Sequence, residues 1–178
     1  MIITERLKLI PLTADDFALC IENKGRMEKK LGLARTGKQL TEKMRGIYQT
    51  KLDYIRRYKE NLLYYTYWQI VPKDKNYIVG EIGFKDAPNS YGEIEVGYGL
   101  ENEHRGNGYM TEALIGLTKW AFSQKGISAI IAVTLKNNIL SQRVLNRSGF
   151  LIQGYDSKHI YWRLENHNKF FLQVNRRL

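Results

Sequence analysis

Apolar residues in the first third of the chain follow strand spacing at first and helical spacing later. The apolar positions at residues 2–3 and 7–10 predict a first strand, and Thr13 is expected to cap a helix whose first turn carries two acidic residues. Glycines interrupt residues 25–37, which are therefore expected to form a loop or short turns. Apolar side chains return at helical spacing over residues 41–63 and predict a long helix.

The spacing then changes to that of extended strands. Residues 64–71 and 77–84 predict the two strands of a hairpin, joined by a turn that begins with Pro72 and ends at Asn76. Residues 93–100 alternate between apolar positions and positions that are glutamate or glycine, and this alternation predicts a third strand.

Helices and strands alternate in the rest of the chain, after a loop over residues 101–108. Helices are expected over residues 109–124 and 139–147, each followed within two residues by a glycine. The expected strands lie at residues 128–134, 150–154 and 159–164. Antiparallel strands followed by a β-α-β-α-β run predict a mixed α/β fold.

The composition is that of one folded domain. The 178 residues are 43% hydrophobic, and no repeat or linker divides them, so residues 1–178 are expected to form one domain with a tail at 166–178. No apolar run approaches the roughly 18 residues that span a membrane, and no secretory signal is visible. The single cysteine, Cys20, favours a reducing compartment, so we expect a cytoplasmic protein.

The formal net charge of +10 is unevenly distributed along the chain. Residues 1–60 carry +6, residues 61–120 carry −3 and residues 121–178 carry +7. A basic balance suits an anionic partner, such as nucleic acid or a phosphorylated cofactor, and it equally suits a solvated surface. No aromatic–basic RNA-binding motif is present. The three histidines lie far apart, without the spacing of a metal site: His104, His159 and His167.

A strand, a loop and a helix between residues 93 and 113 carry the most informative residues. On the predicted strand, Gly97 and Gly99 share a face with two glutamates, and glycines at alternate positions indicate a groove, with an ordinary exposed strand face as the alternative. The loop at residues 105–108 reads Arg-Gly-Asn-Gly. Its glycines let backbone N–H groups turn inward, and the following helix start adds free donors, which suits a pyrophosphate. A plain turn is the alternative interpretation.

This junction resembles the coenzyme A pyrophosphate loop of the GNAT acetyltransferase superfamily. The string Arg-Gly-Asn-Gly-Tyr-Met-Thr-Glu-Ala at residues 105–113 is similar to the branch that contains the ribosomal-protein N-terminal (alanine/serine) acetyltransferases. Residues 4–9, 79–84 and 138–150 resemble three further segments of that branch, in the same order. The resemblance covers residues 1–165.

The resemblance implies a GNAT fold, a central and mostly antiparallel sheet with splayed strands flanked by helices. It further implies a ternary complex in which acetyl-coenzyme A donates its acetyl group to a primary amine, in first place a protein or peptide N-terminus. A ribosomal protein and a second copy of the chain are the expected partners. The alternatives are a small-molecule amine, such as a polyamine or an aminoglycoside, and a non-catalytic acyl-coenzyme A-binding module.

Family positions also imply which residues hold the donor. The expected cofactor contacts are Tyr98, Leu100, Arg105, Gly106, Asn107, Gly108, Tyr109, Met110, Thr111, Asn138, Ser141 and Arg143. Met110 departs from the usual Gly or Ala. Leu145 stands where many relatives carry a tyrosine that acts as general acid, so the resemblance points to Ser141 as the proton donor to the leaving thiolate. An ordinary surface serine is the alternative for Ser141, and helix capping alone would explain Asn138.

The base that removes the amine proton is expected among the glutamates. Glu95 is the first choice, acting through a water, because it lies nearer to the strand glycines than Glu93 does. Glu93, Glu81 and a merely solvated strand face are the alternatives. Cys20 falls in the first predicted helix without a neighbouring histidine, so we expect a core residue and no covalent acetyl-enzyme.

Overall fold

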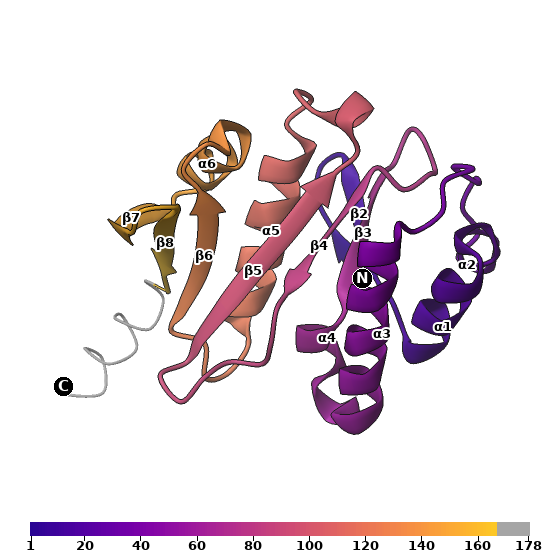
Figure 1. Ribbon diagram of the computed structural model, residues 1–178, viewed down its shortest axis with the longest axis horizontal. Helices are drawn as coiled ribbons and strands as arrows, with labels where there is room; N and C mark the ends of the chain where they lie inside the picture. Colours follow the sequence, from indigo (N-terminus) through magenta and orange to yellow (C-terminus); the bar gives the residue numbers. More distant parts are fainter. Residues whose placement is uncertain (167–178) are drawn as a thin grey trace.

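Eight strands form one open sheet in the computed structural model, which describes residues 1–166 (Figure 1). The strands lie in the order β1-β2-β3-β4-β5-β6-β8-β7, and all neighbours are antiparallel except β5 and β6. Their bounds are β1 Ile2–Ile3, β2 Leu7–Pro11, β3 Tyr67–Pro72, β4 Gly80–Phe84, β5 Glu93–Leu100, β6 Ala129–Leu135, β7 Leu151–Tyr155 and β8 His159–Glu165. The sheet is therefore mixed and mostly antiparallel, as expected.

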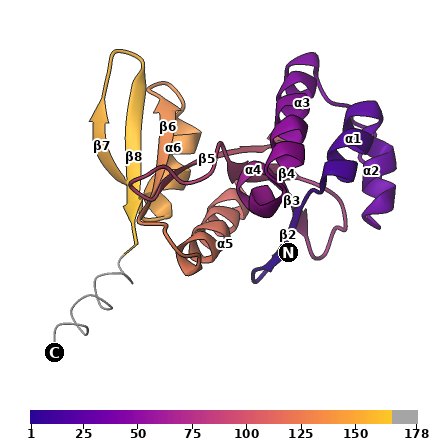
Figure 2. The same cartoon turned by 90° about the horizontal axis from the view of Figure 1, so that it is seen from below.

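Helices lie on both faces of this sheet (Figures 1 and 2). The long helix α5 (Tyr109–Ser123) lies on one face, with α6 (Ile139–Arg147) packed beside it. The helices α1 (Ala14–Glu22), α2 (Lys24–Lys30) and α3 (Glu42–Arg57) lie on the opposite face. Short helical turns are α4 (Leu62–Tyr65) and two 3-10 turns, Lys59–Asn61 and Asn102–His104.

Each helical layer closes an apolar core of its own against the sheet. Leu114 and Leu117 of α5 belong to a buried cluster that includes Trp68 of β3, whereas Phe17 of α1 and Tyr48 of α3 belong to a second cluster. The central strand β3 is consequently buried along nearly its whole length. Burial on both faces explains why the apolar residues of this strand form a run instead of an alternation.

The strands β5 and β6 diverge, and this divergence positions the site described below. They pair in parallel only where Glu93, Ile94 and Glu95 face residues 129–131. Beyond Glu95, β5 continues to pair with β4 on its other side. The backbone groups of residues 96–100 that point away from β4 therefore have no strand partner and face an opening in the sheet (Figure 1).

The prediction of a loop or short turns over residues 25–37 is wrong for its first part, because Lys24–Lys30 form the helix α2. The side chain of Asn23 accepts a hydrogen bond from the backbone N–H of Arg26, and two lysines occupy the last turn, where they interact favourably with the helix dipole. Gly25 is tolerated in the first helical turn. Gly32, with φ +70°, lies beyond the end of the helix.

The long helix expected over residues 41–63 ends early, and the following strand begins late. Thr41 caps α3 as the helical spacing indicates, but α3 ends at Arg57. Tyr65 then belongs to the short helix α4, with its ring 5.5 Å from that of Tyr54 and 5.3 Å from that of Tyr58. This stack of aromatic rings favours a bend of the chain that a linear pattern of apolar residues does not reveal.

Other bounds show where local signals were sufficient. The ranges of β5 and α6 agree with the sequence predictions, and Thr13 forms a capping box with Asp16 at the start of α1. The first strand is instead two strands, β1 and β2, separated by a bend at residues 4–6. The second strand of the hairpin begins only at Gly80, and a 3-10 turn lies within the loop over residues 101–108.

Within residues 1–166, no helix combines the length and the apolar character that crossing a membrane requires. The expectations placed on residues 167–178, including His167 and a contact of the tail with a partner, lie outside the described residues.

Candidate active site

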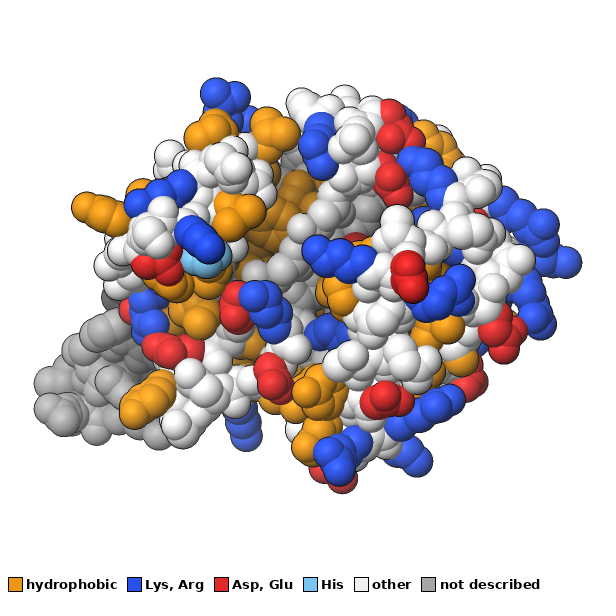
Figure 3. Space-filling view, viewed as in Figure 1, with side chains coloured by type: hydrophobic (Ala, Val, Ile, Leu, Met, Phe, Trp, Pro, Cys, Tyr) orange, Lys and Arg blue, Asp and Glu red, His pale blue; other side chains and the backbone are white. Residues whose placement is uncertain are grey.

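A cavity of about 290 Å³ opens where β5 diverges from β6. The end of β5, the loop that follows it, the start of α5 and the helix α6 form its walls. In Figure 3 the cavity is visible as a hollow, with hydrophobic side chains at its base, between the surfaces over α6 and β5. Its lining residues are Tyr98, Gly99, Leu100, Arg105, Gly106, Gly108, Tyr109, Met110, Thr111, Asn138, Leu140, Ser141, Arg143, Val144 and Arg147.

The loop at residues 105–108 has the conformation that an anion site needs. Gly106 and Gly108 adopt φ +82° and φ +76°, a region that side chains disfavour. Gly108 is the N-cap of α5 and offers no side chain, so the first N–H groups of the helix have no side-chain cap. Arg105 lies on the same cavity. Free N–H groups and a guanidinium together fit a bound pyrophosphate.

Two further guanidinium groups reach this cavity from α6. Arg143 was expected there, but Arg147, Leu140 and Val144 were not. Arg143 and Arg147 are four residues apart on a helix and therefore lie on one face. This spacing could have indicated from the sequence that Arg147 lies beside Arg143. Asn107, in contrast, does not line the cavity. Its side-chain amide donates to the carbonyl oxygens of His104 and Arg105, at 3.2 and 3.3 Å, and so shapes the loop.

The N-terminal bend holds the start of α5 in place. Glu112, in the first turn of α5, accepts hydrogen bonds from the hydroxyl of Thr4 at 2.6 Å and from the backbone N–H and Nε of Arg6, both at 2.7 Å. Arg6 also donates to the carbonyl of Asn107 at 3.0 Å. The resemblance at residues 4–9 therefore includes residues that hold the loop at residues 105–108 and the start of α5 in place.

Glu112→Gln is expected to lower the free energy of unfolding by about 2 kcal/mol at neutral pH, because hydrogen bonds to a charged group contribute about 1.5–3 kcal/mol. Burial opposes the charged form, but hydrogen bonds from Thr4 and Arg6 outweigh it and lower the pKa of Glu112. This stabilisation is complete above the unfolded-state pKa and is lost as the pH falls through the folded-state pKa.

Urea unfolding at neutral and acidic pH checks this prediction. The difference in stability between wild type and Glu112→Gln should shrink on acidification, and a difference that stays constant would contradict it. Glu22→Gln is the control, because Glu22 forms an exposed ion pair with Arg26, and such pairs contribute about 0–1 kcal/mol.

The hydroxyl groups of Tyr98 and Ser141 form a pair on the wall of the cavity. The side chain of Asn138 caps α6 by accepting from the N–H of Ser141 at 3.2 Å. The hydroxyl of Ser141 lies 2.9 Å from the phenolic oxygen of Tyr98, which in turn lies 3.2 Å from the carbonyl of Ser141. Leu145, one turn further along α6, is fully buried in the core. Burial raises the pKa of Tyr98 to about 12, despite the hydrogen bond from Ser141.

An open groove runs along the other face of β5. A Cβ atom added to Gly97 or Gly99 would meet no atom within 4 Å. Register places Gly97 opposite Gly83, and Gly99 opposite Glu81, so the side chain of Glu81 shares the face of this groove. In Figure 3 the groove is a pale diagonal strip, because the floor is backbone without side chains.

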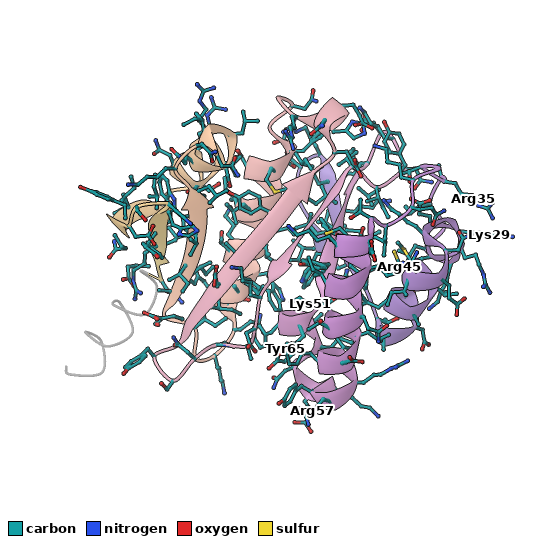
Figure 4. All side chains as sticks on the ribbon, in the orientation of Figure 1. Lys29, Arg35, Arg45, Lys51, Arg57 and Tyr65 are labelled. Carbon is teal, nitrogen blue, oxygen red and sulfur yellow. The ribbon has the colours of Figure 1, made fainter. Side chains whose placement is uncertain are left out.

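Helix α3 contributes two buried polar groups beside this groove. The hydroxyl of Tyr48 donates to the carboxylate of Glu81, and burial raises the pKa of Glu81. The ammonium group of Lys51 donates to the carbonyl oxygens of Phe84 and Lys85, and burial lowers its pKa to about 8. Figure 4 places Lys51 between α3 and β5, whereas Lys29, Arg35 and Arg57 lie at the periphery of the molecule.

The glutamates considered as bases have different surroundings. Glu95 lies on the face of the groove and forms an ion pair with Lys85, and it does not line the cavity. Glu93 accepts hydrogen bonds from Arg163 and Asn89, which lower its pKa. Glu81 has no ion-pair partner within residues 1–166.

Cys20, His104 and His159 do not line the cavity. Cys20 is buried in the second core, and burial raises the pKa of its thiol to about 12. The ring of His104 packs against that of Tyr77, with centroids 5.5 Å apart, and His159 hydrogen-bonds Asp156. Among the described residues, no group of three or more His, Cys, Asp or Glu side chains is arranged to hold a metal ion.

A helix start with uncapped N–H groups lies beside splayed strands, and a groove lies on the face of β5. Residues 6–151 match the acetyltransferase (GNAT) domain family. The chain therefore belongs to the GNAT family of N-acetyltransferases.

Curated relatives include two N-acetyltransferases of Bacillus subtilis strain 168. The uncharacterized N-acetyltransferase YjdG is 37% identical over 95 residues, which cover 53% of this chain and 56% of YjdG. The uncharacterized N-acetyltransferase YoaA is 27% identical over 141 residues, which cover 79% of this chain and 69% of YoaA. The match thus spans little more than half the length of YjdG.

Solved structures share the fold over nearly the whole chain. The ribosomal-protein-S5-alanine acetyltransferase of Vibrio fischeri superposes with a TM-score of 0.68 at 20% identity, covering 92% of this chain and 95% of the other. RimL, a ribosomal L7/L12 α-N-protein acetyltransferase solved with coenzyme A, superposes with a TM-score of 0.65 at 16% identity, covering 91% and 95%. The expected GNAT fold is confirmed.

Proposed function

We propose that this protein transfers the acetyl group of acetyl-coenzyme A to a primary amine by direct attack in a ternary complex. The observation that carries the proposal is that the cavity and the groove both border β5. The cavity with the loop at residues 105–108 lies along the free edge of this strand, and the glycine-lined groove lies on its face. A donor in the cavity and an amine in the groove would meet where β5 leaves β6, and such positioning supplies much of the catalysis.

The residues present fit the donor. The N–H groups at the start of α5, with Arg105, Arg143 and Arg147, would hold its phosphates. Backbone N–H groups of residues 96–100 without a strand partner would bind the pantetheine arm and polarise the thioester carbonyl. Ser141 would give a proton to the departing thiolate, and Glu95 would take one from the amine through a water.

The acceptor is proposed to be the N-terminal amine of a cytoplasmic protein or peptide of the ribosomal type, which would be the transient partner. Support comes from the names of structural neighbours, which include ribosomal-protein alanine and L7/L12 acetyltransferases. Peptides with N-terminal Ala or Ser, the same peptides with a blocked N-terminus, polyamines and aminoglycosides should be incubated with acetyl-coenzyme A and analysed by mass spectrometry. Acetylation of only the free peptides is expected. Acetylation of only the small amines would overturn the acceptor class, and acetylation of none would overturn the activity.

Glu95→Gln is expected to lower the rate most near neutral pH and least at high pH, where more of the amine is already deprotonated. A positioned base contributes roughly 10²–10⁴-fold, so the loss near neutral pH should be about 10²-fold. The measurement is kcat against pH. Glu93→Gln is the control, because Glu93 is held by Arg163 and should have the wild-type profile. A wild-type profile for Glu95→Gln, with the loss in Glu81→Gln instead, would transfer the role to Glu81.

A further inference from the structure

We propose that Tyr98 and Ser141 act as one proton-donating unit, in which Ser141 passes its proton to the sulfur of the donor and Tyr98 replaces that proton. The inference rests on the proposed acetyl transfer and deepens it. Tyr98 becomes a positioned proton source, where the resemblance alone implies only a cofactor contact.

The geometry brings the two hydroxyl groups together from different elements. Tyr98 lies on β5 and Ser141 in the first turn of α6, and their oxygens are 2.9 Å apart on the wall of the cavity. The phenolic oxygen is also 3.2 Å from the carbonyl oxygen of Ser141, so the hydroxyl and the carbonyl of Ser141 both contact Tyr98. Hydroxyl hydrogens rotate, so the same pair of oxygens supports a hydrogen bond in either direction.

The relative acidities of the groups explain why Ser141 needs a second proton donor. A serine hydroxyl is a far weaker acid than a thiol, so Ser141 cannot give up its proton unless another group replaces it. A phenol, with an ordinary pKa of about 10, remains a stronger acid than a serine hydroxyl even where burial raises its pKa to about 12, as at Tyr98. Leu145, one turn along α6, is buried and has no proton to give. The phenol of Tyr98 is the hydroxyl in contact with Ser141, and burial keeps it protonated.

The step balances as follows. The carbon–sulfur bond of the thioester breaks, and sulfur takes the electron pair. The Oγ–H bond of Ser141 breaks as an S–H bond forms. The Oη–H bond of Tyr98 breaks as Ser141 regains a proton, and the phenolate of Tyr98 is then neutralised by a proton from solvent. No oxidant or further reactant is needed.

Kinetics of Tyr98→Phe, Ser141→Ala and the double variant test whether the two residues act as a unit. Each single variant should lower kcat by about 10²-fold, and the double variant should lose no more than the worse single one. Losses that multiply, or a wild-type kcat for Tyr98→Phe, would overturn the proposal. Tyr161→Phe is the matched control, because Tyr161 lies on β8 outside the cavity and its phenol hydrogen-bonds Asp156 in the turn between β7 and β8.

A second readout needs coenzyme A but no amine. The thiolate of bound coenzyme A absorbs in the ultraviolet, so a pH titration of the complex gives the pKa of the bound thiol. A hydrogen bond from the pair should lower this pKa in wild type, and both single variants and the double variant should lose the shift to the same extent. A wild-type thiol pKa in Tyr98→Phe would overturn the relay. A full shift in wild type without acetylation of any amine would instead overturn only the proposed function.

Discussion

Gly108→Val is expected to weaken the binding of coenzyme A by about 100-fold or more. The backbone of Gly108 has φ +76°, which a β-branched residue adopts only at a cost of about 1–3 kcal/mol. An added Cβ would lie 3.3 Å from the guanidinium of Arg6, which braces the loop. The larger side chain would also cover the N–H groups at the start of α5. Loss of about 3 kcal/mol of binding free energy corresponds to roughly 100-fold in affinity.

The control for this variant is Gly126→Val, at the other end of α5. Gly126 has φ +88° and no atom within 4 Å of an added Cβ, so the substitution strains the backbone without touching the cavity. Isothermal titration calorimetry with coenzyme A should separate the two variants, and thermal unfolding should show comparable stability. Equal, wild-type affinity in both would remove the anion site from the loop at residues 105–108.

Ser141→Ala is expected to lower kcat by about 10²-fold while leaving the affinity for coenzyme A nearly unchanged. A general acid contributes roughly 10²–10⁴-fold, and only in the transition state, so its removal affects the chemical step. Binding should persist because the helix start of α5 and the arginines on the cavity are untouched. Single-turnover kinetics gives the chemical step, and calorimetry gives the affinity.

Ser141→Thr is the matched variant, because threonine keeps the hydroxyl. It should restore most of the rate, since position 141 lies in the first turn of α6, where threonine is tolerated. A wild-type kcat in Ser141→Ala would leave protonation of the thiolate to solvent. A loss of affinity in Ser141→Ala equal to the loss of rate would make Ser141 a binding residue instead.

Short-range signals account for the elements that the sequence predicted well. The alternation over residues 93–100 and the cap at Asn138 involve neighbours along the chain, so β5 and α6 have the expected bounds. The predictions for residues 25–37 and 41–71 were wrong in part, because contacts between residues that are distant along the chain shape these segments. The stack of Tyr65 on Tyr54 and Tyr58 forms only after the chain bends, and a linear pattern does not contain it.

By itself, the sequence determined the family and the conformation of the loop at residues 105–108. A site built from consecutive backbone N–H groups needs glycines at set positions before a helix, and Gly106 and Gly108 can be recognised directly in the sequence. Only the tertiary structure decided which side chains contact one another at the site. Tyr98 meets Ser141 across 43 positions, Glu81 meets Tyr48 across 33, and Arg6 meets Glu112 across 106. Such contacts depend on strand register and helix packing, which arise when the sheet assembles and leave no local periodicity in the chain.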